Sequence, residues 1–257
     1  MRGITRVMPI TTTKRLVTLW GVLLLAACHH VAPRPVGDVA GQFADAMRLF
    51  RHGQFADAQA GFQRLQFDLA VRDTLQARVR FYLAESYVGQ QELITAIREF
   101  RRVADDYPAD PLAPVALLRI GDAYAQQWRK PELDPSNGQT SIAAYQELTG
   151  RYPDAPAARI AAQRVRDLQE KFAQKDYANG LFYFRRSAFD SAILYFRGLI
   201  VQYPSSSVVP DAYLRLAQAY KAISYREELR DVCDHLTQNY GGRRDVRQVC
   251  GNGSPGR

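Results

Sequence analysis

The sequence predicts an all-α fold, an α-solenoid of five helix-turn-helix repeats in which the first helix of repeat four is elongated. Three observations predict it. Small and aromatic side chains recur at fixed spacings between residues 41 and 240. A proline or glycine follows most of these repeats, where a helix has to stop. Before repeat four the chain has extra residues, and the apolar ones among them recur at the spacing of a helix.

The first helix of each repeat has a small residue where it would meet the second helix. These residues are Ala46, Ala84, Gly121, Gly180 and Ala217. Leu or Tyr follows three residues later, at Leu49, Tyr87, Tyr124, Tyr183 and Tyr220. Residues three apart lie on the same face of a helix, so both sets belong to one packing face.

The second helix of each repeat carries a matching face. It starts at Ala58, Ala96, Ser141, Ala192 and Leu229, and one turn later come Phe62, Phe100, Tyr145, Phe196 and Cys233. Eight residues further on lie the expected helix ends, at Ala70, Pro108, Pro153, Pro204 and Gly241. Two helices approach closely only where a side chain is small, and an aromatic ring fills the space beside it. Five repeats in phase indicate tetratricopeptide (TPR) repeats.

Repeats three and four depart from a regular array. In repeat three the connection between the helices has extra residues, Arg129–Gln139, with two prolines and Asn137-Gly138, which predicts an exposed loop. In repeat four Pro153 precedes Gly180 by more than the usual distance, and apolar residues continue at helical spacing between them. A single helix from about Ala157 to Arg186, roughly 45 Å long, is therefore expected.

The N-terminus predicts an export signal. Four basic residues precede a short apolar run, Leu16–Leu25, within residues 1–27. Leu25-Ala26-Ala27-Cys28 resembles a lipobox, which predicts cleavage before Cys28, lipid on Cys28 and an extended tether over residues 28–40. The alternatives are a plain signal cut after Ala27 and an uncleaved signal anchor, but both leave Cys28 without a purpose. Met1 and Met8 are both possible starts.

Composition argues against several other classes of protein. Removal of residues 1–27 takes away four basic and no acidic residues, so the formal charge falls from +8 to +4. No basic stripe interleaved with aromatic residues appears, and no nucleic-acid partner is expected. His29 and His30 lack further ligands nearby, so no metal site or cofactor is expected. Because residues 41–240 are fully accounted for by repeats, no catalytic domain is expected either.

Cys233 and Cys250 remain as a pair once Cys28 is assigned to lipid. An exported protein permits disulfides. The pair therefore forms a disulfide that folds the tail, residues 241–257, against repeat five, or Cys233 is a small buried thiol at an aromatic position of the packing face. The sequence favours neither. The tail itself is expected to be flexible.

From Cys28 to about Tyr240 the chain resembles the TPR lipoprotein family of the outer-membrane β-barrel assembly machinery, usually called BamD. The lipobox, three Tyr-Pro helix ends (Tyr107-Pro108, Tyr152-Pro153, Tyr203-Pro204), the looped third repeat and the long helix carry this resemblance. It implies a periplasm-facing outer-membrane lipoprotein that docks on the barrel-forming scaffold subunit (BamA-like) and helps receive unfolded barrel proteins. The alternative is a TPR lipoprotein of pilus or secretin assembly.

A TPR groove is lined by first-helix residues at fixed offsets from the small residue. In repeats one to three these offsets select Phe43, Met47, Arg78, Tyr82, Val115 and Arg119. The aromatic and Met side chains offer adaptable apolar surface, and the arginines suit a terminal carboxylate. An extended, aromatic-rich peptide, such as the last strand of an unfolded barrel, is the expected ligand. The alternative is that Arg78 and Arg119 pair with nearby acids such as Glu85 or Asp122.

Overall fold

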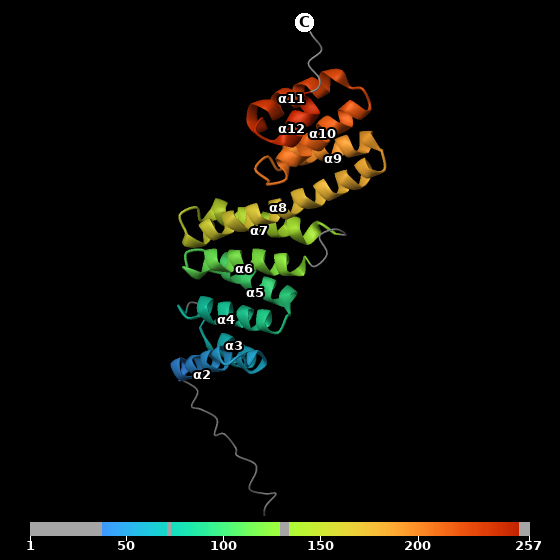
Figure 1. The fold of residues 1–257 in the computed structure, drawn as a ribbon. Coiled ribbons are helices and arrows are strands. Elements are labelled where there is room, and N and C mark those ends of the chain that lie inside the picture. Colours follow the sequence, from blue (N-terminus) through green and yellow to red (C-terminus); the bar gives the residue numbers. More distant parts are fainter. Residues whose placement is uncertain (1–37, 71–72, 129–133, 252–257) are drawn as a thin grey trace, which may run out of the picture. The chain divides into compact units, whose positions relative to one another are not determined.

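The structure is a computed structural model that describes residues 38–70, 73–128 and 134–251, and every regular element within these ranges is an α-helix (Figure 1). This confirms the all-α prediction. The helices are α2 (Val39–Arg51), α3 (Phe55–Asp68), α4 (Gln76–Gly89), α5 (Leu93–Asp106), α6 (Leu112–Gln127), α7 (Ser136–Arg151), α8 (Pro156–Arg185), α9 (Phe189–Gln202), α10 (Val209–Ala222), α11 (Arg226–Tyr240) and α12 (Arg244–Cys250). Within the described ranges, none of them is long and apolar enough to cross a membrane.

The helices from α2 to α11 form five consecutive hairpins. From α3 onward each helix packs on the next, and α4 with α6 and α6 with α8 bring the first helices of neighbouring repeats together. Figure 1 shows this order along the chain, with α12 beside α10 and α11. The core is therefore a continuous series of helix-helix interfaces, as a solenoid requires.

The predicted packing face lies in these interfaces. Tyr145 and Phe196 are 1% and 0% exposed. A Cβ atom added to Gly121 would lie 2.3 Å from Cε1 of Tyr145, and one added to Gly180 would lie 2.5 Å from Cε1 of Phe196. Such distances are far inside van der Waals contact, so only a glycine lets the aromatic ring reach the opposite backbone.

Of the five turns that join the two helices of a hairpin, four share one backbone conformation. The residue seven positions after the small residue has a positive φ in each, at Gly53 (74°), Gln91 (63°), Ser187 (59°) and Ser224 (63°). The next amide then donates to a carbonyl five residues back, as from Glu92 to Tyr87 (2.9 Å). This bond closes the first helix in the way of a Schellman motif. Since only one of the four residues is glycine, composition did not reveal the motif.

The elongated first helix of repeat four is confirmed. α8 has 30 residues, Pro156–Arg185, with Pro156 in its first turn. Its early turns pack on α6 and α7, and its later turns pair with α9. Phe172, in the middle of α8, lies against Trp128 at the end of α6, with 4.4 Å between ring centroids. The extra turns of α8 therefore cover repeat three before repeat four begins.

In repeat three, residues 129–133 of the exposed loop predicted for Arg129–Gln139 lie outside the residues that the structure describes, and the later part of that loop is mostly helical. α7 already begins at Ser136, and Gly138 is buried, with Trp128 atoms 2.8 Å from a Cβ atom added there. The prediction of an exposed Asn-Gly turn was therefore wrong. The helix starts early because Asp134 Oδ1 accepts the Ser136 amide (2.9 Å), while the Asp134 carbonyl accepts the Trp128 indole N–H (2.8 Å).

The C-terminal segment also differs from the expected flexible tail, since α12 occupies residues 244–250. Val246 is 2% exposed and belongs to a cluster with Leu214, Ala217 and Leu236. Apolar burial thus fixes a segment whose Gly and Arg content suggested disorder. The structure joins Cys233 to Cys250 in a disulfide, with 5.4 Å between the Cα atoms.

Candidate peptide-binding surface

Aromatic side chains from α2 and α4 form a connected cluster. The ring centroid of Tyr82 lies 6.3 Å from that of Phe43 and 5.6 Å from that of Phe50. Beneath them Phe62 of α3 is fully buried, 5.9 Å from Phe43 and 6.0 Å from Tyr82. Arg78 lies over the Phe43 ring at 5.3 Å. We call Phe43, Phe50, Tyr82 and Arg78 the aromatic surface.

The structure brings three of the six predicted groove residues together in this surface: Phe43, Arg78 and Tyr82. Met47 does not join it, because it is only 9% exposed and belongs to the core beside Ala46. Val115 is half-buried on α6. Phe50 was not predicted to belong to this surface. It lies one helical turn after Ala46, on the face that was expected to pack against the second helix.

Arg119 has the alternative partners that the sequence suggested. Its Nε lies 2.6 Å from Glu85 Oε1, and its NH1 lies 3.7 Å from Asp122. Arg164 of α8 extends this chain of charges, 3.7 Å from Asp122. The ion pairs link α4, α6 and α8, so Arg119, although its side chain is 46% exposed, already has carboxylate partners within the protein.

Burial around these ion pairs changes two titrations. Burial raises the pKa of Glu85, and the neighbouring Arg119 only partly offsets that rise. Burial also raises the pKa of Tyr145, as does the hydrogen bond that its hydroxyl donates to Asp122 Oδ1 (2.7 Å). The charged form of Glu85 and of Tyr145 is therefore costly at these positions, which favours a structural role for the ion pairs around Arg119.

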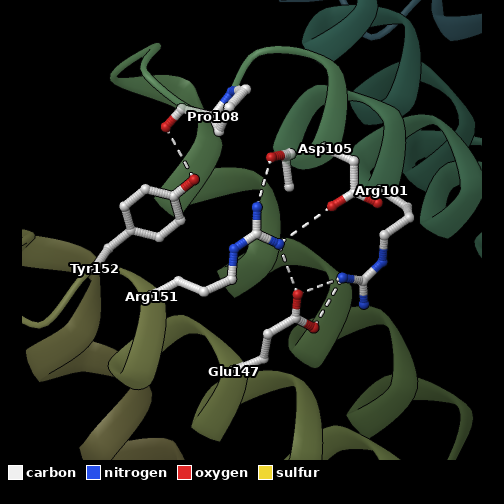
Figure 2. A network of polar contacts seen from close by, with 7 residues as sticks. Arg101, Asp105, Pro108, Glu147, Arg151 and Tyr152 are labelled. Atoms are coloured by element: carbon white, nitrogen blue, oxygen red, sulfur yellow. Dashed lines mark hydrogen bonds and ion pairs between the residues drawn. The ribbon is translucent and has the colours of Figure 1, made fainter.

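A second polar network joins the second helices of repeats two and three (Figure 2). Arg101 of α5 donates to both oxygens of Glu147 (2.6 and 2.8 Å). Arg151 of α7 bonds Glu147 Oε1 (2.8 Å) and Asp105 (3.1 Å). Burial opposes the charged form of Glu147, but these arginine hydrogen bonds outweigh it and lower the pKa of Glu147.

Figure 2 also shows a contact between two of the Tyr-Pro helix ends, in which the Tyr152 hydroxyl donates to the Pro108 carbonyl (2.9 Å). Both acid-arginine pairs between α5 and α7 are 46 residues apart in sequence. This repeated separation of an arginine and an acid is visible in the sequence and could have indicated the network. Its charges balance, so it fixes neighbouring repeats and offers no free binding group.

Neither a metal site nor the lipid site can be placed in this geometry. Among the residues that the structure describes, no group of three or more His, Cys, Asp or Glu side chains is arranged to hold a metal ion. Cys28, His29 and His30 lie outside those residues.

Three curated relatives share sequence with the chain, and each carries the name outer membrane protein assembly factor BamD. The relative from Caulobacter vibrioides is 28% identical over 158 residues, which span 62% of this chain and 52% of the relative. The relative from Xylella fastidiosa is 26% identical over 213 residues, 77% of this chain and 72% of the relative. The relative from Vibrio cholerae is 28% identical over 96 residues, 37% of this chain and 40% of the relative. The chain thus spans about half the length of the first relative.

Solved structures with similar folds include the TPR2AB-domain:pHSP90 complex of yeast Sti1. It has a TM-score of 0.45 and 15% identity, and it covers 83% of this chain and 82% of that one. The P58(IPK) TPR domain has a TM-score of 0.42 and 14% identity, over 83% of this chain and 54% of that one. The model of the YfiO family, described as outer membrane lipoprotein, matches residues 38–236. The chain therefore belongs to the YfiO family of outer membrane lipoproteins.

Proposed function

We propose that the chain is a scaffold in outer-membrane protein assembly, which docks on the barrel-forming scaffold subunit and helps receive unfolded barrel proteins. The family match over residues 38–236 carries this proposal, together with the name shared by the three relatives. Helical repeats suit the role, since stacked hairpins present extended surfaces to partner proteins. The family match gives no support to the alternative of pilus or secretin assembly.

The proposed function is tested by purification of the tagged chain from its own membranes in a mild detergent. We expect a β-barrel assembly scaffold subunit to co-purify in constant proportion through a second, size-based step. Mass spectrometry identifies the co-purifying protein. Recovery of a secretin or pilus component in its place, with no barrel scaffold, would contradict the proposal.

We also propose a periplasm-facing orientation and a lipid anchor on Cys28. We expect the mature protein to begin at Cys28 and to carry acyl chains, because the lipobox ends the apolar run of the signal. Each buried CH₂ contributes about 0.8 kcal/mol, so several chains hold a protein firmly on a membrane. Intact-mass analysis should show acylation, and Cys28→Ala should move the chain to the soluble fraction. An unmodified Cys28, or an intact Met1 or Met8, would refute the anchor.

The aromatic surface is our candidate contact for the unfolded barrel. Strands of a transmembrane barrel alternate outward apolar side chains with inward polar ones, with aromatic residues at both membrane interfaces. Such side chains match Phe43, Phe50 and Tyr82, since aromatic pairs gain about 0.5–1.5 kcal/mol beyond area burial. A C-terminal strand also ends in a carboxylate. Arg78 makes no ion pair among the described residues, whereas Glu85 engages Arg119, so Arg78 is the candidate for that carboxylate.

We expect Arg78→Glu to weaken binding of a barrel-derived C-terminal peptide at least tenfold, about 1.4 kcal/mol. The matched control is Arg64→Glu, which makes the same change of charge on an exposed face of α3. Arg119→Glu is a second comparison, because Arg119 was predicted to bind the peptide carboxylate but the structure pairs it with Glu85. Fluorescence anisotropy with the free-acid and amidated peptides provides the affinities. If amidation costs nothing, or if Arg78→Glu binds like wild type, the aromatic surface is not the receptor.

A further inference from the structure

A pocket lies at the turn between α8 and α9, away from the aromatic surface in sequence. Its volume is about 400 Å³. Part of its lining is apolar, and the Phe184 and Phe189 rings meet edge to face there, 5.4 Å apart. The full lining is Leu181, Phe184, Arg185, Ser187, Phe189, Arg215, Gln218 and Ala222.

The polar residues of this lining can all donate hydrogen bonds, and none of them is a carboxylate. Arg215 is held in place, because it donates to Gln218 Oε1 (2.9 Å) and lies 5.7 Å from the centroid of Phe184. Its other N–H groups are not used by this bond. Within the described residues neither Arg185 nor Arg215 forms an ion pair. Two cations with no counter-charge favour an anionic ligand.

The surface beside the pocket combines aromatic and cationic groups. Phe182, on the last turns of α8, is 49% exposed. The guanidinium of Arg186 lies over its ring, 3.6 Å from the centroid. Exposed aromatic rings next to arginines are typical of surfaces that meet a lipid headgroup region, where the ring enters the interface and the cation meets phosphate. This observation is independent of the pocket and favours the same kind of ligand.

We propose that this pocket binds the headgroup of an anionic phospholipid. Arg185 and Arg215 donate to the phosphodiester oxygens, and the glycerol and first methylenes of the acyl chains pack on Phe184 and Phe189. The carboxylates of an acidic peptide would pair with the two arginines, but they would make no use of the apolar floor of the pocket, formed by Phe184 and Phe189, or of the exposed Phe182 ring. A free phosphate would leave the apolar floor uncovered. The proposal is independent of peptide binding by the aromatic surface on α2 and α4.

Native mass spectrometry of the detergent-released, full-length protein tests the proposal. The probes are dihexanoyl phosphatidylglycerol and dihexanoyl phosphatidylcholine, which differ in headgroup charge. We expect one phosphatidylglycerol per chain and at least tenfold weaker retention of phosphatidylcholine. Arg185→Gln with Arg215→Gln should reduce phosphatidylglycerol binding at least tenfold. The control, Arg159→Gln, changes an exposed arginine near the opposite end of α8 and should bind like wild type.

Circular dichroism and thermal unfolding establish whether each variant is folded. If the double variant does not fold, Phe182→Ser with Phe189→Leu reports on the apolar contacts instead, with the same expected loss. Equal retention of the two lipids, or an unchanged affinity in a folded double variant, would overturn the proposal. So would displacement of the lipid by inorganic phosphate at equal concentration, or by an Asp/Glu-rich peptide that binds the same arginines more tightly.

Discussion

Phe196→Ala is expected to lower the free energy of unfolding by about 4 kcal/mol, the largest loss from any single truncation that we propose. The Phe196 ring is 0% exposed and fills the space that Gly180 leaves between α8 and α9. It also lies 5.7 Å from the Tyr177 ring. Its removal leaves a cavity between two backbones that already approach as closely as a glycine permits, so the site has little room to collapse.

The matched control is Phe182→Ala on α8, the helix against which Phe196 packs. Phe182 is 49% exposed, so its truncation should cost less than about 1 kcal/mol. Urea unfolding followed by circular dichroism gives the total loss. Amide hydrogen exchange shows whether the loss is concentrated in α8 and α9, as nearest-neighbour coupling of repeats implies. Equal losses for the two variants would contradict the packing role assigned to Phe196.

Removal of the Cys233–Cys250 disulfide by paired serine substitutions is expected to cost roughly 3 kcal/mol in the chain-entropy model, for a sequence separation of 17. The effect should be local, with faster amide exchange in α11 and α12 and little change in α2 to α7. In the oxidised protein, thiol labelling after unfolding without reductant should find neither cysteine reactive. Two reactive thiols would show that the bond does not form.

The repeat architecture could be predicted because its determinants are local in sequence. Each packing face sets a small residue such as Gly180 against an aromatic such as Phe196, and both lie within one hairpin. Their spacing is therefore fixed by the geometry of a helix and is visible in the printed sequence. The length of α8 was equally visible, since no proline interrupts its apolar spacing.

The parts that could not be predicted depend on contacts between repeats. The pairing of Arg119 on α6 with Glu85 on α4 depends on how neighbouring hairpins stack, so the sequence left two alternatives open. Gly138 suggested a turn, but Trp128, which follows α6, and Phe172 of α8 enclose it. Met47 had the offset of a groove residue, yet its burial is set by the fit of α2 on its neighbours. In each case the deciding atoms come from elsewhere in the chain.

The position of α12 has a consequence for self-association. Every internal repeat buries one face on its successor, so the last repeat of an array has an apolar face without a successor. If that face were bare, the first repeat of a second molecule could add to it, and such head-to-tail contacts do not close but grow into filaments. Here Val246 fills the face between Leu214 and Leu236, and Arg243 ties α12 to Asp211 of α10 (2.6 Å). Growth at this end would first have to displace a helix that is both paired and covalently linked.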